Sequence, residues 1–255
     1  MSSGLLLLAD SRLPSGGHGH SGGVEALVDR GLLRTADDLA LFLAGRLMTG
    51  AAVPAGAAAA ACALAGLQQG DTPATGLLQG ALPPTGSQQG HIAAMAGPAW
   101  RAWDHAVSAR LPAAASRAAS HAQGAALLRT ASRAWPSASL DELRTLPRAH
   151  HPLVLGAAAA AAGAVPTDAA LLAVHHLIGG ACTAAVRLLG LDPLAVAAVA
   201  AEAGRSAEPL VADAAQAGVA AAAAADPALL PTDGSPLYDV LAQLHRSTEA
   251  TLFAS

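Results

Sequence analysis

The sequence predicts an all-α protein, a single compact helical bundle rich in alanine and leucine that spans residues 1–255. Hydrophobic residues make up 53% of the chain, yet aromatics are only 2% and the only isoleucines are Ile92 and Ile178, so strand-forming residues are scarce. Alanine and leucine lead the helix-propensity scale because they lose little side-chain freedom in a helix. A chain of this length buries about 70–75% of its unfolded surface and needs no disulfide or metal to hold a core.

Capping residues and glycines mark the first helices. Ser21 is expected to cap a short helix over residues 24–28, after a turn in which glycines supply positive φ. Thr35 is expected to start a second helix, which carries Leu39, Leu43 and Leu47 on one face. A longer helix is predicted over residues 112–134, with Pro112 in its first turn.

Two helices are predicted between residues 167 and 225. Thr167 and Asp168 open the first, with apolar and histidine side chains at helical spacing: Leu171, Leu172, His175 and Ile178. Asp192 and Pro193 open the second, which runs to about residue 225. We expect a break between residues 204 and 209, because proline removes a backbone donor and clashes inside a helix.

A C-terminal helix is predicted to begin at Ser235, the cap, with Pro236 in the first turn. Its apolar face would comprise Leu237, Leu241, Leu244, Thr248 and Leu252.

No linker is long enough to divide the chain, so we expect one domain. The segment of about 68–98 is rich in Gly, Pro, Gln and Thr and is predicted to be a flexible surface excursion between helices. Cys62 and Cys182 lie far apart in alanine-rich stretches, which favours two buried, reduced thiols.

The charge balance excludes a general nucleic-acid binder. The 14 basic residues, all arginine, and 18 acidic residues give a net charge of −4 without a basic run, whereas such binders cluster cations against phosphates. The N-terminus lacks a cationic region before Asp10, which argues against a signal peptide. The most apolar stretches, 51–66, 152–165 and 214–225, are shorter than the roughly 18–20 residues of a membrane span. We therefore expect a soluble, cytoplasmic protein.

Residues 9–25 carry the most informative motif. Gly19–Gly23 matches G-x-S-x-G, the serine-hydrolase elbow with Ser21 as nucleophile, but that motif has meaning only between a strand and a helix. His18 and His20 could bind a metal weakly, although no Asp, Glu or Cys follows at ligand spacing. We therefore favour a tight turn before a helix over either kind of site.

The other histidine pairs, His150-His151 and His175-His176, are adjacent in sequence. Neighbours on a helix point about 100° apart, so these pairs favour hydrogen-bonded core or surface histidines over metal ligands. No P-loop is present, because the chain has no lysine. The residues alone therefore predict no nucleotide site and no convincing active site.

Motifs in one order along the chain resemble a known family. Residues 5–33 run from a leucine-rich stretch through a Pro-x-Gly-Gly turn to His-Ser-x-Gly-x-Glu. Further motifs follow at 109–112, 120–128, 151–156, 184–188 and 236–255. Together they resemble the UreF family of urease accessory proteins, in its actinobacterial form, and only about 68–98 stays unmatched. Three positions depart from the family pattern: Ala125 and Thr251 stand where a basic residue is common, and Arg246 where glutamate is common.

The resemblance implies an all-helical, non-enzymatic homodimer without a tightly bound cofactor or metal of its own. Proteins of this family join a UreD/UreH-type accessory protein and the GTPase UreG in an assembly that delivers nickel to apo-urease. The family member recruits the GTPase and regulates its GTP cycle, while the complex handles the nickel. Neither nucleic acid nor membrane is implied as a partner.

We expect residues 9–25 and 236–255 to form partner-contacting surfaces that order on assembly, since a glycine-rich turn and an apolar tail are poorly suited to water alone. The candidate partner-binding residues are Pro14, Gly16, Gly17, His20, Ser21, Gly23, Glu25, Gln123, Gly124, Arg187, His245, Leu252, Phe253 and Ser255.

Three alternatives stay open. An arginine supplied to the GTPase could accelerate hydrolysis, with Arg187 the best-matched position, though a helix-stabilising role fits it equally well. A small serine hydrolase would use Ser21 and a histidine. A plain nickel-binding carrier would rely on the ten histidines.

Overall fold

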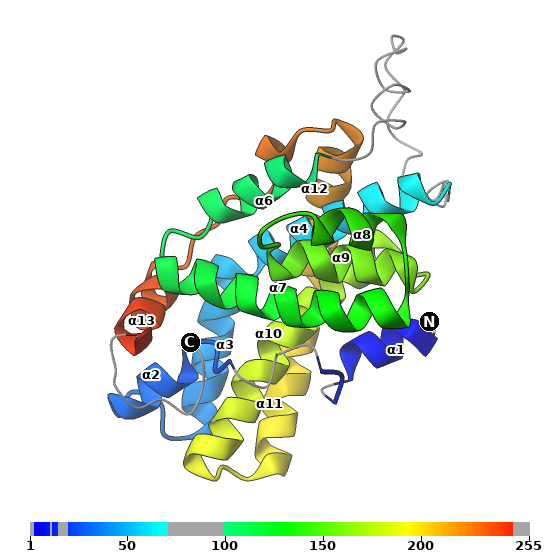
Figure 1. The fold of residues 1–255 in the computed structure, drawn as a ribbon. Helices are drawn as coiled ribbons and strands as arrows, with labels where there is room; N and C mark the ends of the chain where they lie inside the picture. Colours follow the sequence, from blue (N-terminus) through cyan, green and yellow to red (C-terminus); the bar gives the residue numbers. More distant parts are fainter. Residues whose placement is uncertain (1–2, 11, 15–19, 71–98, 247–255) are drawn as a thin grey trace.

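The computed structural model describes residues 3–10, 12–14, 20–70 and 99–246, and over these ranges the chain is all-α, as predicted (Figure 1). The helices are α1 (Ser3–Ala9), α2 (Val24–Asp29), α3 (Ala36–Gly50), α4 (Ala52–Gln68), α6 (Trp100–Ala109), α7 (Ala114–Ala134), α8 (Ala138–Arg144), α9 (His151–Ala161), α10 (Pro166–Leu189), α11 (Pro193–Ser206), α12 (Glu208–Ala223) and α13 (Pro236–Arg246), with a short 3₁₀ turn, η2 (Pro227–Leu229). The predicted surface excursion lies almost wholly outside the described residues.

Helix α4 forms the centre of the packing. Most of its buried residues are alanines, and it packs against α9, α10 and α12. Two glycines on the neighbouring helices bring the backbones together: a Cβ at Gly156 of α9 would overlap the carbonyl oxygen of Ala58, and one at Gly218 of α12 would overlap that of Gly56. Burial of apolar surface contributes about 25 cal/mol per Å², and an alanine side chain buries little apolar area. Such a helix therefore gains stability only through close contact along its whole length.

The buried apolar residues form two clusters, and α4 contributes to both. One cluster joins α4 to α6–α9, with Leu127, Leu140 and Leu153 fully buried. The other joins the opposite side of α4 to α2, α3, α10, α11 and α12, with Leu39 and Leu43 fully buried. The predicted buried face of α3 is thereby confirmed.

The helix ends confirm most of the predicted starts. Thr35 and Asp38 form a reciprocal capping box at α3, and Asp192 accepts the backbone N–H of Leu194 at α11. Helix α10 begins at Pro166, one residue before the predicted start, because Asp168 accepts the backbone N–H of Val165 at 3.2 Å. The predicted break falls at Ala207, between α11 and α12.

Two predictions about helix starts are wrong. Pro112 lies outside α7, which begins at Ala114, so the proline precedes the helix instead of occupying its first turn. Ser21 does not cap α2: the N-cap residue is Gly23, with φ of 97°, and the Ser21 hydroxyl makes no hydrogen bond with any described residue.

Both cysteines are free and buried, as predicted. Loss of hydration raises the pKa of Cys62 to about 12 and that of Cys182 to about 11, so both remain protonated thiols at neutral pH.

Within the described part of the chain, one single helix, α10, is long and apolar enough to cross a membrane by length and composition alone. More than half of its most apolar window is buried against other helices, as in the core helix of a soluble protein.

The close approach at α4 gives a testable prediction. Replacing Gly156 with alanine should destabilise the protein by about 1–3 kcal/mol, because the added methyl group must push α9 away from α4. Replacing Gly45 of α3, whose Cβ would meet no other group, should instead stabilise it by about 0.5–1 kcal/mol through helix propensity. Urea denaturation of both variants measures the difference, and equal effects would disprove the packing argument.

Candidate functional site

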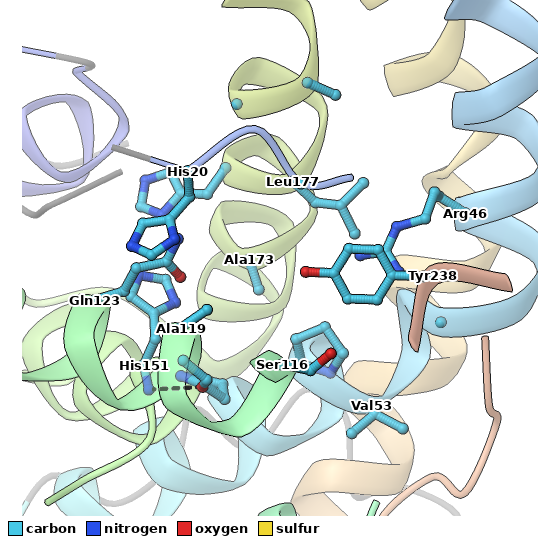
Figure 2. A pocket seen from close by; sticks show the side chains of 18 of the residues that line it. His20, Arg46, Val53, Ser116, Ala119, Gln123, His151, Ala173, Leu177 and Tyr238 are labelled. Atoms are coloured by element: carbon cyan, nitrogen blue, oxygen red, sulfur yellow. Dashed lines mark hydrogen bonds between the residues drawn. The ribbon is translucent and has the colours of Figure 1, made fainter. Parts of the chain in front are cut away.

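A cavity of about 270 Å³ lies where α3, α7, α9, α10 and α13 meet the segment that precedes α2 (Figure 2). Its wall includes His20, Arg46, Val53, Ser116, Ala119, Gln123, His151, Ala173, His175, His176, Leu177 and Tyr238. The sequence motifs at 20–25, 120–128, 151–156 and 236–246 therefore converge on one place in the fold.

Histidines form one side of this cavity. Figure 2 shows His20 and His151 close together, on the same side as Gln123 and apart from Arg46 and Tyr238. The rings of His151 and His176 lie 5.7 Å apart between centroids. Loss of hydration, together with His176 and His20, lowers the pKa of His151 to about 3. Hydration loss also lowers the pKa of His176, so both imidazoles are neutral at physiological pH.

The adjacent pair on α10 ties α1 to the cavity wall. His176 Nε2 lies 2.9 Å from the Leu8 carbonyl oxygen, and His175 Nε2 lies 3.2 Å from that of Ala9. These contacts confirm the reading of the pair as hydrogen-bonded histidines. Although the two residues are neighbours on the helix, both rings reach the last turn of α1.

The opposite side carries a cation and an aromatic ring. The Arg46 guanidinium carbon lies 3.5 Å from the centre of the Tyr238 ring, a cation–π contact between α3 and α13. Loss of hydration lowers the pKa of Arg46, and Tyr238 and Asp239 oppose that shift. Ser116 donates a 3.1 Å hydrogen bond to Asp239, which fixes α13 on α7.

A close approach between α7 and the start of α9 positions Gln123 and His151. A Cβ at Gly124 would overlap the carbonyl oxygen of Ala149, so only glycine lets α7 pack against this turn. Ser120, one turn earlier, accepts the backbone N–H of His151 at 3.3 Å. Gln123 and His151 consequently both line the cavity, as Figure 2 shows.

The segment before α2 joins the cavity to α13. Gly22 and Gly23 have φ of 61° and 97°, so glycines supply positive φ there as predicted. A Cβ at Gly23 would meet the Tyr238 ring at 3.2 Å, which places the N-terminal motif directly against α13. The two segments expected to contact partners therefore lie together.

Several candidate residues lie away from the cavity. Pro14 accepts a 2.8 Å hydrogen bond from Thr130 through its carbonyl oxygen, and Glu25 is buried in the first turn of α2. Arg187 is exposed in the last turn of α10, where a cation complements the helix dipole. His245 and Arg246 are the last residues of α13, and Ala125 is exposed on α7. Gly16, Gly17, His18, Thr248, Thr251, Leu252, Phe253 and Ser255 lie outside the described residues.

The site contains groups that sequence reasoning missed. Arg46 and Tyr238 come from helices read only for their leucine faces, and their pairing depends on how α3 and α13 pack. His151 and His176 were assigned to core or surface roles, and their convergence from α9 and α10 leaves no signal in sequence spacing.

The arrangement offers neutral imidazoles on one side and an arginine–tyrosine pair on the other. Among the described residues, no three of the cavity histidines bring ring nitrogens to the spacing of metal ligands. The buried Ser21 hydroxyl makes no hydrogen bond to a histidine of the described residues, and no strand leads into α2 in these ranges, so the geometry does not favour a serine hydrolase.

Comparison with known proteins extends the resemblance. The UreF family model matches residues 33–204. The urease accessory protein UreF of Mycobacterium sp. strain JLS is 41% identical over 251 residues, which cover 98% of this chain and 97% of that protein. Proteins of the same name from Mycolicibacterium vanbaalenii and Mycobacterium marinum are 38% and 37% identical over the same shares of each chain.

The neutral state of His176 predicts a pH dependence of stability. Because the folded-state pKa lies below the ordinary value of 6.5, the unfolded chain binds more protons as pH falls, and stability decreases below about pH 6.5. His176→Gln keeps a donor for the Leu8 carbonyl but removes the titration. Urea denaturation at several pH values should show a shallower loss for the variant, by up to about 1.4 kcal/mol per pH unit. Parallel profiles would contradict this assignment.

Proposed function

Since the chain belongs to the UreF family of urease accessory proteins, we propose that it is a non-catalytic scaffold in the cytosol that joins a UreD/UreH-type protein to a UreG-type GTPase. In this role it regulates the GTP-dependent delivery of nickel to apo-urease and acts as a homodimer. The observation that carries the scaffold role is the meeting of the N-terminal motif and α13 beside an uncovered apolar surface.

That surface is a stripe on α13. Leu237, Val240 and Leu244 are 64%, 55% and 39% exposed, and their spacing of three and four residues places them on one side of the helix. Leu241, four residues after Leu237, is buried at the edge of the same face, so among the described residues of the predicted apolar face only Leu241 is packed into the core, whereas Leu237 and Leu244 are exposed. An amphipathic helix whose apolar face is left mostly exposed supports docking of a partner helix or groove. We assign this stripe to the UreD/UreH-type protein.

The cavity supports a role in handling nickel without retaining it. Neutral imidazoles are good ligands for nickel, but the cavity histidines do not converge as a set of three. A nickel ion that passes through the cavity would therefore bind weakly to successive histidines along this wall instead of tightly at one site. The plain nickel-carrier alternative requires tight binding here, which this geometry does not favour.

The proposal is tested by size exclusion with light scattering on this chain alone and co-expressed with UreD/UreH-type and UreG-type partners. We expect a complex with two copies of each component. A chain that elutes alone as a monodisperse species in the presence of both partners would overturn the scaffold role.

The stripe on α13 yields a sharper prediction. Leu237→Asp with Val240→Asp should abolish co-elution with the UreD/UreH-type protein, because a carboxylate buried in an apolar interface loses its hydration without a partner. Gln243→Glu, an exposed change on the same helix that also adds a negative charge, should leave co-elution intact. The melting temperature of each free variant shows whether folding is preserved. Co-elution of the double variant would remove the stripe from the interface.

A further inference from the structure

A second polar cluster lies outside the cavity wall, between α6, α7 and the residue that precedes α9. It consists of Asp104, His121 and His150, none of which lines the cavity. One ligand atom from each residue lies within 4.8 Å of the others. We infer that these three side chains bind one divalent transition-metal ion, such as Zn²⁺ or Ni²⁺. Imidazole and carboxylate groups are both suitable ligands for such an ion.

The distances are close to those of a metal site. His121 Nε2 lies 3.7 Å from Asp104 Oδ2, and the rings of His121 and His150 stack with centroids 3.8 Å apart. Ligand atoms about 2.0–2.2 Å from a tetrahedral ion lie roughly 3.3 Å from one another. Small side-chain rotations therefore bring the three groups to bonding distance without movement of the helices.

A buried nitrogen without a hydrogen bond points to a missing ligand. His121 Nε2 is buried and has no hydrogen-bond partner among the described residues, and its distance to Asp104 exceeds a hydrogen bond. Leaving such an atom unsatisfied is unfavourable, because it loses its hydration without gaining a bond in exchange. A metal ion would satisfy the nitrogen and the free carboxylate oxygen together.

Surrounding groups hold the other two ligands in place. Asp104 Oδ1 accepts the backbone N–H of His150 at 2.9 Å, which leaves Oδ2 for the ion. The ring nitrogens of His150 lie 2.7 Å from the Ser108 hydroxyl and 3.0 Å from that of Ser120. When one nitrogen binds the ion and its serine turns away, the other can donate to its serine, as in most metal-bound histidines.

A pocket of about 650 Å³ gives access from solvent. Its wall includes His121, Ser108 and His105, together with Arg117 and Arg148. The Arg117 guanidinium donates to the carbonyl oxygens of Leu111 and Pro112, and Arg148 is exposed. The two arginines oppose a cation, so they lower the affinity of the site. They also provide the means to distinguish a metal ion from an anion.

The test is isothermal titration of the full chain with Zn²⁺ and with Ni²⁺. We expect one ion per chain above the weak background of the remaining histidines. We expect Asp104→Asn and His121→Gln each to weaken that binding by more than the about 10–100-fold that follows loss of a residue that only supports a metal ligand. The asparagine keeps an oxygen acceptor for the His150 N–H. Asp213→Asn, which removes an exposed carboxylate on α12 that lines neither the cavity nor this pocket, should leave the binding unchanged.

The variant Arg148→Gln distinguishes a site for a cation from a site for an anion. Removing this exposed cation should strengthen Zn²⁺ binding, whereas a site for anions would lose affinity for inorganic phosphate in the same variant. Saturable metal binding that is lost in Asp104→Asn and His121→Gln, in folded protein, supports the site. No saturable binding, binding indifferent to both substitutions, or phosphate binding that depends on Arg148 would overturn it. Because the readout is the isolated chain, this result does not depend on the proposed role in urease maturation.

Discussion

The fold depends on how closely α4 approaches α9 and α12. An alanine surface buries little area per residue, so these helices are held by contact between backbones, which Gly156 and Gly218 permit. Both apolar clusters include residues of α4, and neither would be continuous if the helices moved apart. Larger side chains at the two glycines would remove the contact on which both clusters rely.

The same constraint positions the functional groups. Helix α9 packs closely against α4, and Gly124, which has no side chain, lets α7 pack closely against the turn where α9 begins. At that turn His150 and His151 diverge: His150 meets Ser108, Ser120 and the His121 ring, while His151 faces the cavity. Two adjacent histidines thus serve two separate polar sites, because consecutive residues at a helix start point in different directions.

Sequence patterns predicted the helical class and most helix starts, because capping residues act locally: Thr35, Asp168 and Asp192 need only their own helix. Ser21 failed as a cap because tertiary packing of Gly23 against Tyr238 set the turn instead. Of the candidate residues, His20 and Gln123 line the cavity, and both were named from the family resemblance and not from their spacing in the sequence. Arg46, His176 and Asp104 could not be found this way, because their partners come from distant helices and leave no spacing signal.

The proposed role of this chain is that of an accessory scaffold for nickel insertion. Its most direct test is the nickel content of urease purified from cells that co-express the urease subunits and the UreD/UreH-type and UreG-type proteins, with or without this chain. We predict that urease from cells with the chain contains nickel and hydrolyses urea, whereas urease from cells without it is largely apo-protein. Equal nickel content in the two preparations would contradict the account.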